Sequence, residues 1–338
     1  MAPTDVAVET ERLTKRYGQL TALHEVSLRV GRGQILGIIG PNGAGKTTLI
    51  KILVGLARPT SGRAWIGGVD CVRYARRIKR LVGYMPDTFG AYDNMRVSEY
   101  LDFFGAVFGV APRQRRQRIQ AVLEMVDGLD LWDRYVETLS HGMQQKVAIA
   151  RTLMHDPQVL ILDEPANGLD PEARVEMRQL LLNLARGGKT LIVTSHILPE
   201  LSRICDLVAI LSSGRLKAFG PLADIMRRVR QERTIEIQLV RPDDVPRTVA
   251  LVNQWAGDEL ATASVQELVV RFRTAHSEEW LADLLKELVE QGIRVGQLRE
   301  LQADLEDAFL EVTREPDRSA ADAVRSASGA ADGSMEES

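Results

Sequence analysis

The stretch Gly40-Pro-Asn-Gly-Ala-Gly-Lys-Thr-Thr48 decides how the rest of the sequence is interpreted. It follows an apolar run at residues 35–39, which predicts a buried strand, and it precedes residues 49–54, whose apolar spacing predicts a helix. The pattern G-x-x-x-x-G-K-[ST] between a strand and a helix is typical of a phosphate-binding loop, because glycines let successive N–H groups point at one anion. The predicted phosphate-binding residues are Gly40, Pro41, Asn42, Gly43, Ala44, Gly45, Lys46, Thr47 and Thr48.

Two side chains of this loop have separate expected tasks. Lys46 offers a flexible positive charge to the outer phosphates of a nucleotide, and the hydroxyl of Thr47 is placed to bind Mg²⁺. The alternative is a glycine-rich turn that carries a lysine by chance. The agreement of both flanking segments with the motif disfavours this alternative.

A second apolar run, residues 159–162, ends in Asp163-Glu164-Pro165. Such a run is typical of a strand buried on both faces of a parallel sheet, and ligands bind beyond the carboxyl ends of these strands. We therefore expect Asp163 to hold Mg²⁺ and Glu164 to orient or deprotonate a water that attacks the terminal phosphate. An ordinary acidic pair at a helix start is the alternative, which the upstream loop disfavours.

Three further segments are candidates for the same chemistry. Tyr17 follows a predicted strand and offers its ring to stack on an adenine base. His196 follows the apolar run at residues 189–194, and its imidazole is expected to hydrogen-bond the terminal phosphate or the attacking water. The stretch Leu139-Ser-His-Gly-Met-Gln-Gln-Lys146 runs into a helix with Ser140 as its N-cap, which predicts a second anion-binding helix start. One nucleotide does not need two such starts, whereas a nucleotide shared between two copies of the chain would use both.

The composition sets limits on the whole chain. Its 338 residues favour two domains, and an apolar content of 45% is enough for a substantial core. Residues 1–230 carry 32 basic and 23 acidic side chains, a net charge of +9, whereas residues 231–338 carry 11 and 23, a net charge of −12. This contrast predicts two units with different partners. No nucleic-acid-binding motif accompanies the basic part, so nucleic acid is not expected as a partner.

The sequence also predicts a compartment. No apolar run approaches the about 20 residues needed to cross a bilayer, and the N-terminal segment lacks the basic and apolar regions of a secretion signal. Cys71 and Cys205 lack metal-ligand spacing and are typical of buried free thiols in a reducing compartment. We therefore expect a cytoplasmic protein whose role at the membrane depends on a partner.

The pattern of apolar residues predicts three segments. Residues 1–230 are expected to form an ATP-binding domain with a helical subdomain at about 88–155, where residues 97–108 have helical apolar spacing. The aromatic residues of that helix either fill the core of the subdomain or form a surface for a docking partner. Residues 231–315 predict the order strand-helix-strand-strand-helix-strand, which fits a small α+β, ferredoxin-like accessory or regulatory domain. Residues 316–338 have the composition of a disordered tail.

Taken in order, these motifs make residues 6–225 resemble the nucleotide-binding subunit of ATP-binding cassette (ABC) transporters. The resemblance implies an α/β fold of the P-loop NTPase class (ABC-type ATPase), with ATP and Mg²⁺ as cofactors. It also implies that Tyr17 stacks on adenine and that His196 is the switch histidine. It assigns a signature sequence, which closes over the nucleotide of the other copy, and a dimer-contact loop. These are Leu139, Ser140, His141, Gly142 and Met143 for the signature, and Gly168, Leu169 and Asp170 for the loop.

The resemblance further implies an ATPase subunit that powers a separate membrane permease, as a homodimer on the cytoplasmic face of the cell membrane. Residues 305–312 are similar to the C-terminal extension of the drug-resistance and efflux branch, so we expect an exporter. The alternative is a soluble ABC-type ATPase that acts on ribosomes or DNA. The single cassette and the lack of a long coiled-coil insertion argue against this alternative.

Three positions, in two motifs, depart from the family pattern. The family usually reads Leu-Ser-Gly-Gly-Gln at the signature, whereas this chain has His141 and Met143 at its third and fifth positions. Ser140 and Gly142 remain, so the expected phosphate contacts are kept. The family usually has glutamine where this chain has Asp87, an additional candidate Mg²⁺ ligand that brings a full charge towards the metal.

Overall fold

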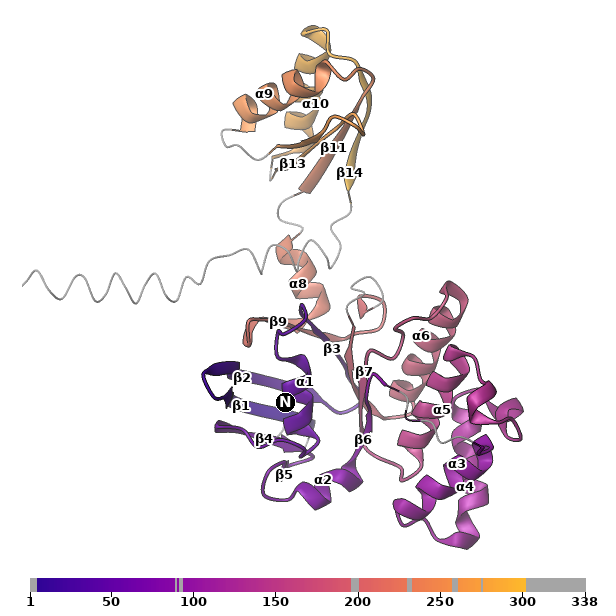
Figure 1. Ribbon diagram of the computed structural model, residues 1–338. Coiled ribbons are helices and arrows are strands. Elements are labelled where there is room, and N and C mark those ends of the chain that lie inside the picture. Colours follow the sequence, from indigo (N-terminus) through magenta and orange to yellow (C-terminus); the bar gives the residue numbers. More distant parts are fainter. Residues whose placement is uncertain are drawn as a thin grey trace, which may run out of the picture. The chain divides into compact units, whose positions relative to one another are not determined.

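The computed structural model describes residues 5–88, 90, 94–195, 201–229, 233–256, 261–274 and 276–301 (Figure 1). Its first elements are β1 (Val6–Tyr17), β2 (Leu20–Gly31), β3 (Ile35–Ile39), α1 (Lys46–Leu53), β4 (Ser61–Ile66), β5 (Val69–Asp70), α2 (Ala75–Leu81), β6 (Val82–Met85), α3 (Val97–Val107) and α4 (Pro112–Met125). They are followed by η2 (Leu129–Leu131), η3 (Val136–Thr138), α5 (His141–Leu153), β7 (Val159–Asp163), α6 (Pro171–Arg186), β8 (Thr190–Thr194), β9 (Leu207–Ser212) and β10 (Arg215–Pro221). The remaining elements are α8 (Leu222–Val229), β11 (Arg233–Leu239), α9 (Asp244–Ala256), β12 (Thr262–Ser264), β13 (Val269–Thr274), α10 (Glu278–Glu290) and β14 (Val295–Leu301).

The chain divides into two compact units. Of the described residues, 5–222 belong to the first and 223–301 to the second. Within them no helix has the length and apolar character of a membrane span. Cys71 and Cys205 are both buried and free, as predicted.

The main sheet of the first unit has the strand order β10-β9-β3-β8-β7-β6. Its strands are parallel except for β10, which pairs antiparallel with β9. Strands β3, β7 and β8 are buried at every position, as their continuous apolar runs predicted. Because parallel strands end at the same edge, the loop after β3 and the carboxylates at the end of β7 lie on one side of the sheet.

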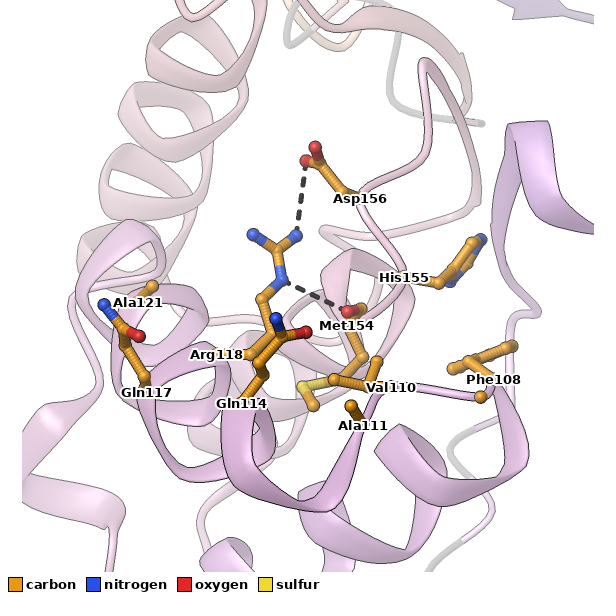
Figure 2. Close-up of a pocket in the computed structure, with 11 residues that line it drawn as sticks. Phe108, Val110, Ala111, Gln114, Gln117, Arg118, Ala121, Met154, His155 and Asp156 are labelled. Atoms are coloured by element: carbon orange, nitrogen blue, oxygen red, sulfur yellow. Dashed lines mark hydrogen bonds and ion pairs between the residues drawn. The ribbon is translucent and has the colours of Figure 1, made fainter.

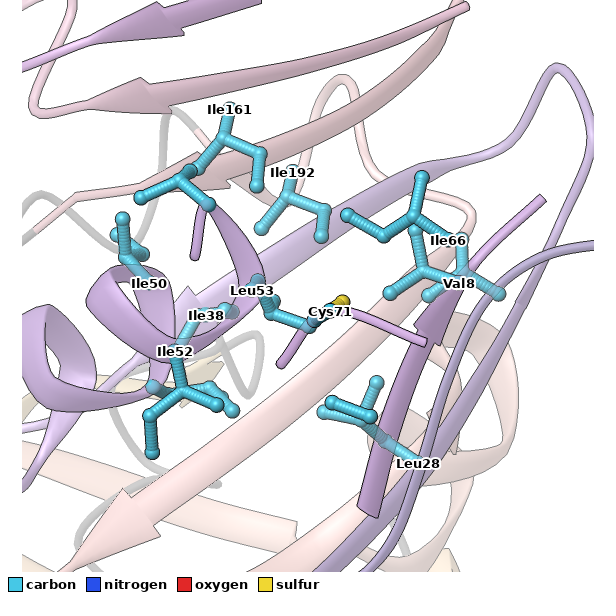
Figure 3. Close-up of a cluster of buried hydrophobic side chains, with 14 of the residues drawn as sticks. Val8, Leu28, Ile38, Ile50, Ile52, Leu53, Ile66, Cys71, Ile161 and Ile192 are labelled. Carbon is cyan, nitrogen blue, oxygen red and sulfur yellow. The ribbon is translucent and has the colours of Figure 1, made fainter. Parts of the chain in front are cut away.

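A second, antiparallel sheet has the order β2-β1-β4-β5, and α1 lies between the two sheets. The apolar side of α1 consists of Leu49, Ile50, Ile52 and Leu53, which have no exposed surface. Figure 3 shows this core, in which side chains of both sheets surround the helix. The residues labelled from the two sheets are Val8, Leu28, Ile38, Ile66, Ile161 and Ile192. The helix that follows the phosphate-binding loop is therefore anchored in the core of the unit.

Helices α3, α4 and α5 pack against one another (Figure 1). The predicted helix at residues 97–108 is present as α3, and some of its apolar residues fill the core, whereas the docking surface stays a prediction. Tyr100 and Leu101 are fully buried, whereas Phe103 and Phe108 are 42% and 38% exposed. Helix α2 is not predicted by the sequence; it is a short basic helix in which only Ile78 is buried.

The second unit contains one antiparallel sheet with the order β12-β13-β11-β14. Helices α9 and α10 supply the other half of its core, with residues such as Val252 and Leu284 packed against Ile235, Ile237 and Phe272. The element order is strand-helix-strand-strand-helix-strand, which is the predicted ferredoxin-like arrangement. The sequence predicts two strands between the helices but does not indicate where β12 lies. The stretches 305–312 and 316–338 lie outside the described residues.

Candidate functional site

A cleft of about 670 Å³ collects most of the predicted site residues at the carboxyl edge of the main sheet. It is lined by residues from β1 and β2, the loop after β3 with the start of α1, the segment after β6, the end of β7 and the turn after β9. These are Tyr17, Leu20, Thr21, Ala22, Pro41, Asn42, Gly43, Ala44, Gly45, Lys46, Thr47, Thr48, Asp87, Asp163, Glu164 and Ser213. Gly40 belongs to the same loop, and its carbonyl oxygen accepts a hydrogen bond from Lys46.

The loop after β3 has the backbone that a phosphate-binding loop requires. Gly43 and Gly45 have φ angles of 81° and 105°, which residues with a side chain rarely adopt. A Cβ at Gly45 would lie 2.5 Å from the carbonyl oxygen of Ala22, so glycine is also required by space. The Nζ of Lys46 donates to the carbonyl oxygens of Gly40 at 2.5 Å and Pro41 at 3.3 Å, which places its charge over the loop.

The two acidic residues after β7 are fixed by a neighbouring strand. Asp163 is only 7% exposed, and its Oδ1 accepts a hydrogen bond of 2.5 Å from the hydroxyl of Thr194 on β8. The same hydroxyl accepts the backbone N–H of Glu164 at 3.0 Å. Glu164 has a φ of 54°, an unusual value for a residue other than glycine. Such strain is common at functional sites, and here it sets where the Glu164 side chain begins.

The electrostatics of the cleft favour a cation. Burial raises the pKa of Asp163, and the nearby carboxylates of Glu164 and Asp87 raise it further, against the hydrogen bond from Thr194 and the charge of Lys46. Burial, with the charges of Asp163 and Asp87, also raises the pKa of Tyr84 to about 12. A divalent cation would relieve the repulsion among these carboxylates.

The donors in the cleft suit Mg²⁺ bound together with phosphate. No group of three His, Cys, Asp or Glu in the described part of the chain is arranged to hold a metal by itself. The hydroxyl of Thr47 and the carboxylate of Asp163 line one cleft, and Asp87 is a third oxygen donor there. Mg²⁺ is commonly held by one or two carboxylates, with phosphate oxygens and water completing its shell.

Tyr17 lies at the edge of this cleft, and the residue is 47% exposed. The Nζ of Lys15 is 4.7 Å from the centre of that ring, a cation–π contact. The stacking of Tyr17 on an adenine base stays a prediction. His196, the other predicted contact of the terminal phosphate, lies outside the described residues.

The predicted signature and dimer-contact loop do not line this cleft. Ser140 is the N-cap of α5, and its Oγ accepts the N–H of Met143 at 3.4 Å. Asp170 is the N-cap of α6, where its Oδ1 accepts the N–H of Ala173 at 2.8 Å. The two helix starts are adjacent, because Nε2 of His141 lies 2.8 Å from the carbonyl oxygen of Asn167.

The hydrogen bonds that join Thr194 to Asp163 and Glu164 are not predicted by the sequence. The residue was placed in a predicted strand, but its hydrogen bonds to Asp163 and Glu164 depend on the pairing of β7 with β8. The one available signal was a hydroxyl at the end of an apolar run. It pointed to no particular partner.

The chain is similar to ATP-binding proteins over most of its length. The family model "ABC transporter" matches residues 23–167. The Nod factor export ATP-binding protein I of Ralstonia nicotianae is 35% identical over 90% of this chain and 93% of that protein. The daunorubicin resistance ATP-binding protein DrrA2 of Streptomyces coeruleorubidus is 33% identical over 91% of this chain and 95% of that protein. The linearmycin resistance ATP-binding protein LnrL of Bacillus subtilis is 30% identical over 90% and 98%.

Solved structures are similar to the first unit. A structure of an ATP-binding subunit of an ABC transporter aligns with a TM-score of 0.59 and 31% identity, covering 66% of this chain and 92% of that chain. The dimeric structure of a bacterial ABC transporter cassette aligns with a TM-score of 0.58 and 25% identity, covering 64% of this chain and 98% of that one.

Proposed function

The chain belongs to the ABC transporter family, in the branch of export and resistance ATP-binding proteins, and we propose that it hydrolyses ATP to drive a separate membrane permease as an exporter. The observation that carries this proposal is the convergence of Lys46, Asp163 and Glu164 in one cleft. Names of the relatives refer to export and resistance, which favours this function over a soluble ATPase that acts on ribosomes or DNA.

In the proposed reaction, the loop from Gly40 to Thr48 binds the phosphates through its N–H groups and the start of α1. Lys46 neutralises the outer phosphates, and Tyr17 stacks on the adenine. Thr47 and Asp163 would hold Mg²⁺, with Asp87 as a further candidate ligand. When bound there, Mg²⁺ would neutralise charge on the transferring phosphoryl group.

Glu164 is the proposed base. Its carboxylate orients a water for attack on the terminal phosphate and takes a proton from it. The hydrogen bond from its backbone N–H to the hydroxyl of Thr194 holds this residue against the end of β8, as the bond from Thr194 does for Asp163. Glu164 thus acts on the water while Asp163 acts on the metal.

The site of one copy is proposed to be completed by a second. Ser140 and the N-terminus of α5 are suited to bind phosphate, yet this helix start does not line the cleft of its own chain. A homodimer would bring it to the nucleotide of the partner copy, with Gly168, Leu169 and Asp170 at the dimer contact. The similarity to a dimeric cassette structure supports this arrangement.

We place the permease at a groove of about 630 Å³ between the end of α3, the start of α4 and the turn after α5 (Figure 2). Its apolar side includes Phe108, Val110 and Met154. Its other side is held by Arg118, which donates to the carbonyl oxygens of Leu153 and Met154 and pairs with Asp156 at 3.3 Å. A short cytoplasmic helix of the permease would bury its apolar face against these residues.

The ATPase proposal is tested with three variants of the full-length chain, each measured with and without its permease. Lys46→Ala should lose tight nucleotide binding. Glu164→Gln should bind ATP, hydrolyse it very slowly and accumulate as a dimer. Ser140→Ala should hydrolyse poorly while single copies still bind ATP. Hydrolysis by Glu164→Gln at the parent rate would show that another group is the base.

The docking proposal has its own test. Phe108→Asp should reduce co-purification with the permease, whereas ATP binding by the isolated chain should stay at the parent level. Val175→Asp is the matched control, because Val175 is an exposed apolar residue that does not line the groove. Equal recovery of the permease with Phe108→Asp and with the control would reject this surface.

A further inference from the structure

We propose that His141 is a positioning residue that ties the start of α5 to the turn before α6 within one chain. The signature serine and the dimer-contact loop would then meet the partner copy as one rigid unit. This inference rests on the proposed ATP-driven homodimer and adds to it a residue that the dimer requires.

The contact between the two segments is direct. His141 is the first residue of α5, and its Nε2 lies 2.8 Å from the carbonyl oxygen of Asn167. A carbonyl oxygen can only accept, so the imidazole donates from Nε2. The ring also lies against Gly168, where an added Cβ would be 3.3 Å from Nε2 and 3.4 Å from Cδ2 of His141.

Two further contacts join the same helices beyond His141. A Cβ at Gly142 would lie 3.4 Å from the Cβ of Ala173, so α5 and α6 approach closely near their starts. One turn further along α5, the Nζ of Lys146 pairs with Glu176 at 2.9 Å. Leu169, between the two segments, is only 4% exposed. These contacts hold the helices together, and His141 extends the connection to the backbone of the loop itself.

The connection depends on which residue stands at position 141, because it is made by the side chain of His141. The family pattern usually has glycine at the position of His141, and glycine has no side chain that could reach Asn167. The turn at Asn167-Gly168 has backbone hydrogen bonds of its own, such as that from Asn167 N–H to the carbonyl oxygen of Glu164 at 3.1 Å. Without the bond from His141, its position against the start of α5 would have to be fixed when the dimer closes, and that ordering would oppose closure. A net hydrogen bond of ordinary strength corresponds to about a three- to tenfold change in an equilibrium constant.

Substitution of His141 by glutamine or by asparagine distinguishes the effect of the hydrogen bond from the effect of side-chain size. The amide nitrogen of glutamine reaches the position of the histidine Nε2, whereas that of asparagine reaches only the position of Nδ1. His141→Gln should therefore keep the donor to Asn167, and His141→Asn should lose it while remaining polar. His141→Ala removes the ring as well.

The test uses the full-length chain with Glu164→Gln, alone and with its permease, and titrates Mg·ATP while dimerisation is followed by light scattering or crosslinking. In His141→Asn and His141→Ala, the ATP concentration for half-maximal dimerisation should rise about three- to tenfold. His141→Gln should restore most of the parent behaviour. Binding of a fluorescent ATP analogue to single copies, measured at a dilution where no dimer forms, should be the same in all four proteins.

The outcomes separate this inference from the function on which it rests. If Glu164→Gln with the native His141 does not dimerise at saturating ATP, the proposed dimer fails. If it does dimerise and the asparagine and glutamine variants need the same ATP concentration, the dimer stands and His141 has no positioning role. Loss of single-copy ATP binding in His141→Asn would also overturn the inference, since it would place the effect within one chain.

Discussion

The hydroxyl of Thr194 lies 2.5 Å from Oδ1 of Asp163 and accepts the backbone N–H of Glu164 at 3.0 Å. One side chain on β8 therefore bonds to both acidic residues at the end of β7. Thr194 is itself fully buried, so water does not replace these bonds if the hydroxyl is removed.

Thr194→Val should weaken Mg²⁺-dependent hydrolysis. The hydrogen bond from Thr194 lowers the pKa of Asp163, so its loss raises that pKa and leaves less carboxylate to bind the metal. We expect a higher Mg²⁺ concentration for half-maximal activity, an acid limb of the pH–rate profile moved to higher pH, and a loss of about 1–3 kcal/mol in unfolding free energy. Thr194→Ser keeps the hydroxyl and is the control. A metal dependence identical in the valine and serine variants would contradict this account.

Asp87→Gln should keep nucleotide binding and alter turnover. The charge of Asp87 raises the pKa of Asp163, so its removal should lower that pKa and move the acid limb of the pH–rate profile to lower pH. We expect the rate of hydrolysis at neutral pH to change by about two- to tenfold, the range that one nearby charge supplies. Steady-state kinetics over a pH series would measure this, with Asp87→Asn as the second uncharged variant. Unchanged kinetics in both would remove Asp87 from the site.

The stability of the first unit should depend on His155 at mildly acidic pH. Burial lowers the pKa of His155 from its ordinary 6.5, and the charges of Arg118 and Lys189 lower it further, against the hydrogen bond to Val82 and the charge of Asp156. The unfolded chain therefore binds a proton that the folded chain does not. The contribution of neutral His155 to the unfolding free energy is complete above pH 6.5. It is lost as the pH falls from 6.5 towards the lower pKa that His155 has in the folded chain.

Urea unfolding at a series of pH values would measure this dependence, with His155→Gln as the control. Glutamine places an amide donor where Nε2 of His155 meets the carbonyl oxygen of Val82 at 3.0 Å, and it does not titrate. Its unfolding free energy should fall less than that of the parent between pH 6.5 and the folded pKa. If the unfolding free energy falls equally steeply with pH in the parent and in His155→Gln, groups other than His155 cause the pH dependence.

Glu236 should stabilise the sheet of the second unit. It is 3% exposed on β11, and its carboxylate accepts from Nε of Arg271 on β13 and from Nε of Arg299 on β14, each at 2.7 Å. Glu236→Gln would remove the charge that both arginines share and would leave Arg271 only its longer pair with Glu267 at 3.7 Å. The expected cost is about 1–3 kcal/mol, because both arginines are partly exposed. The control combines Glu236→Leu with Arg271→Met and Arg299→Met. This triple variant should lose less unfolding free energy than Glu236→Gln does. Thermal unfolding followed by tryptophan fluorescence would measure this in a background with Trp65→Phe and Trp132→Phe, where the signal comes from Trp255 and Trp280 of this unit.

The parts of the fold that sequence predicted well share a physical basis. Strands β3, β7 and β8 are buried at every position, so their apolar runs were continuous and led directly to the loop and the carboxylates. Helix α2 buries only Ile78, and β12 has three residues of which none is buried, so neither produced an apolar period. The bonds of Thr194 and the contact of His141 with Asn167 depend on strand register and loop geometry, which a single sequence does not contain.

The boundary of the first domain at residue 230 and the role of His196 remain predictions. The individual tasks of the site residues also remain predictions, although Tyr17, residues 41–48, Asp87, Asp163 and Glu164 line one cleft. The variants described above address these tasks one at a time.

The position of α1 between the two sheets has a mechanical consequence. Protein interiors are packed as densely as organic crystals and transmit displacement instead of absorbing it. A shift of the loop when ADP and phosphate leave would therefore move α1 and both sheets together. In the proposed ATPase cycle, α1 and the two sheets of the first unit would respond to nucleotide exchange at this end as one body.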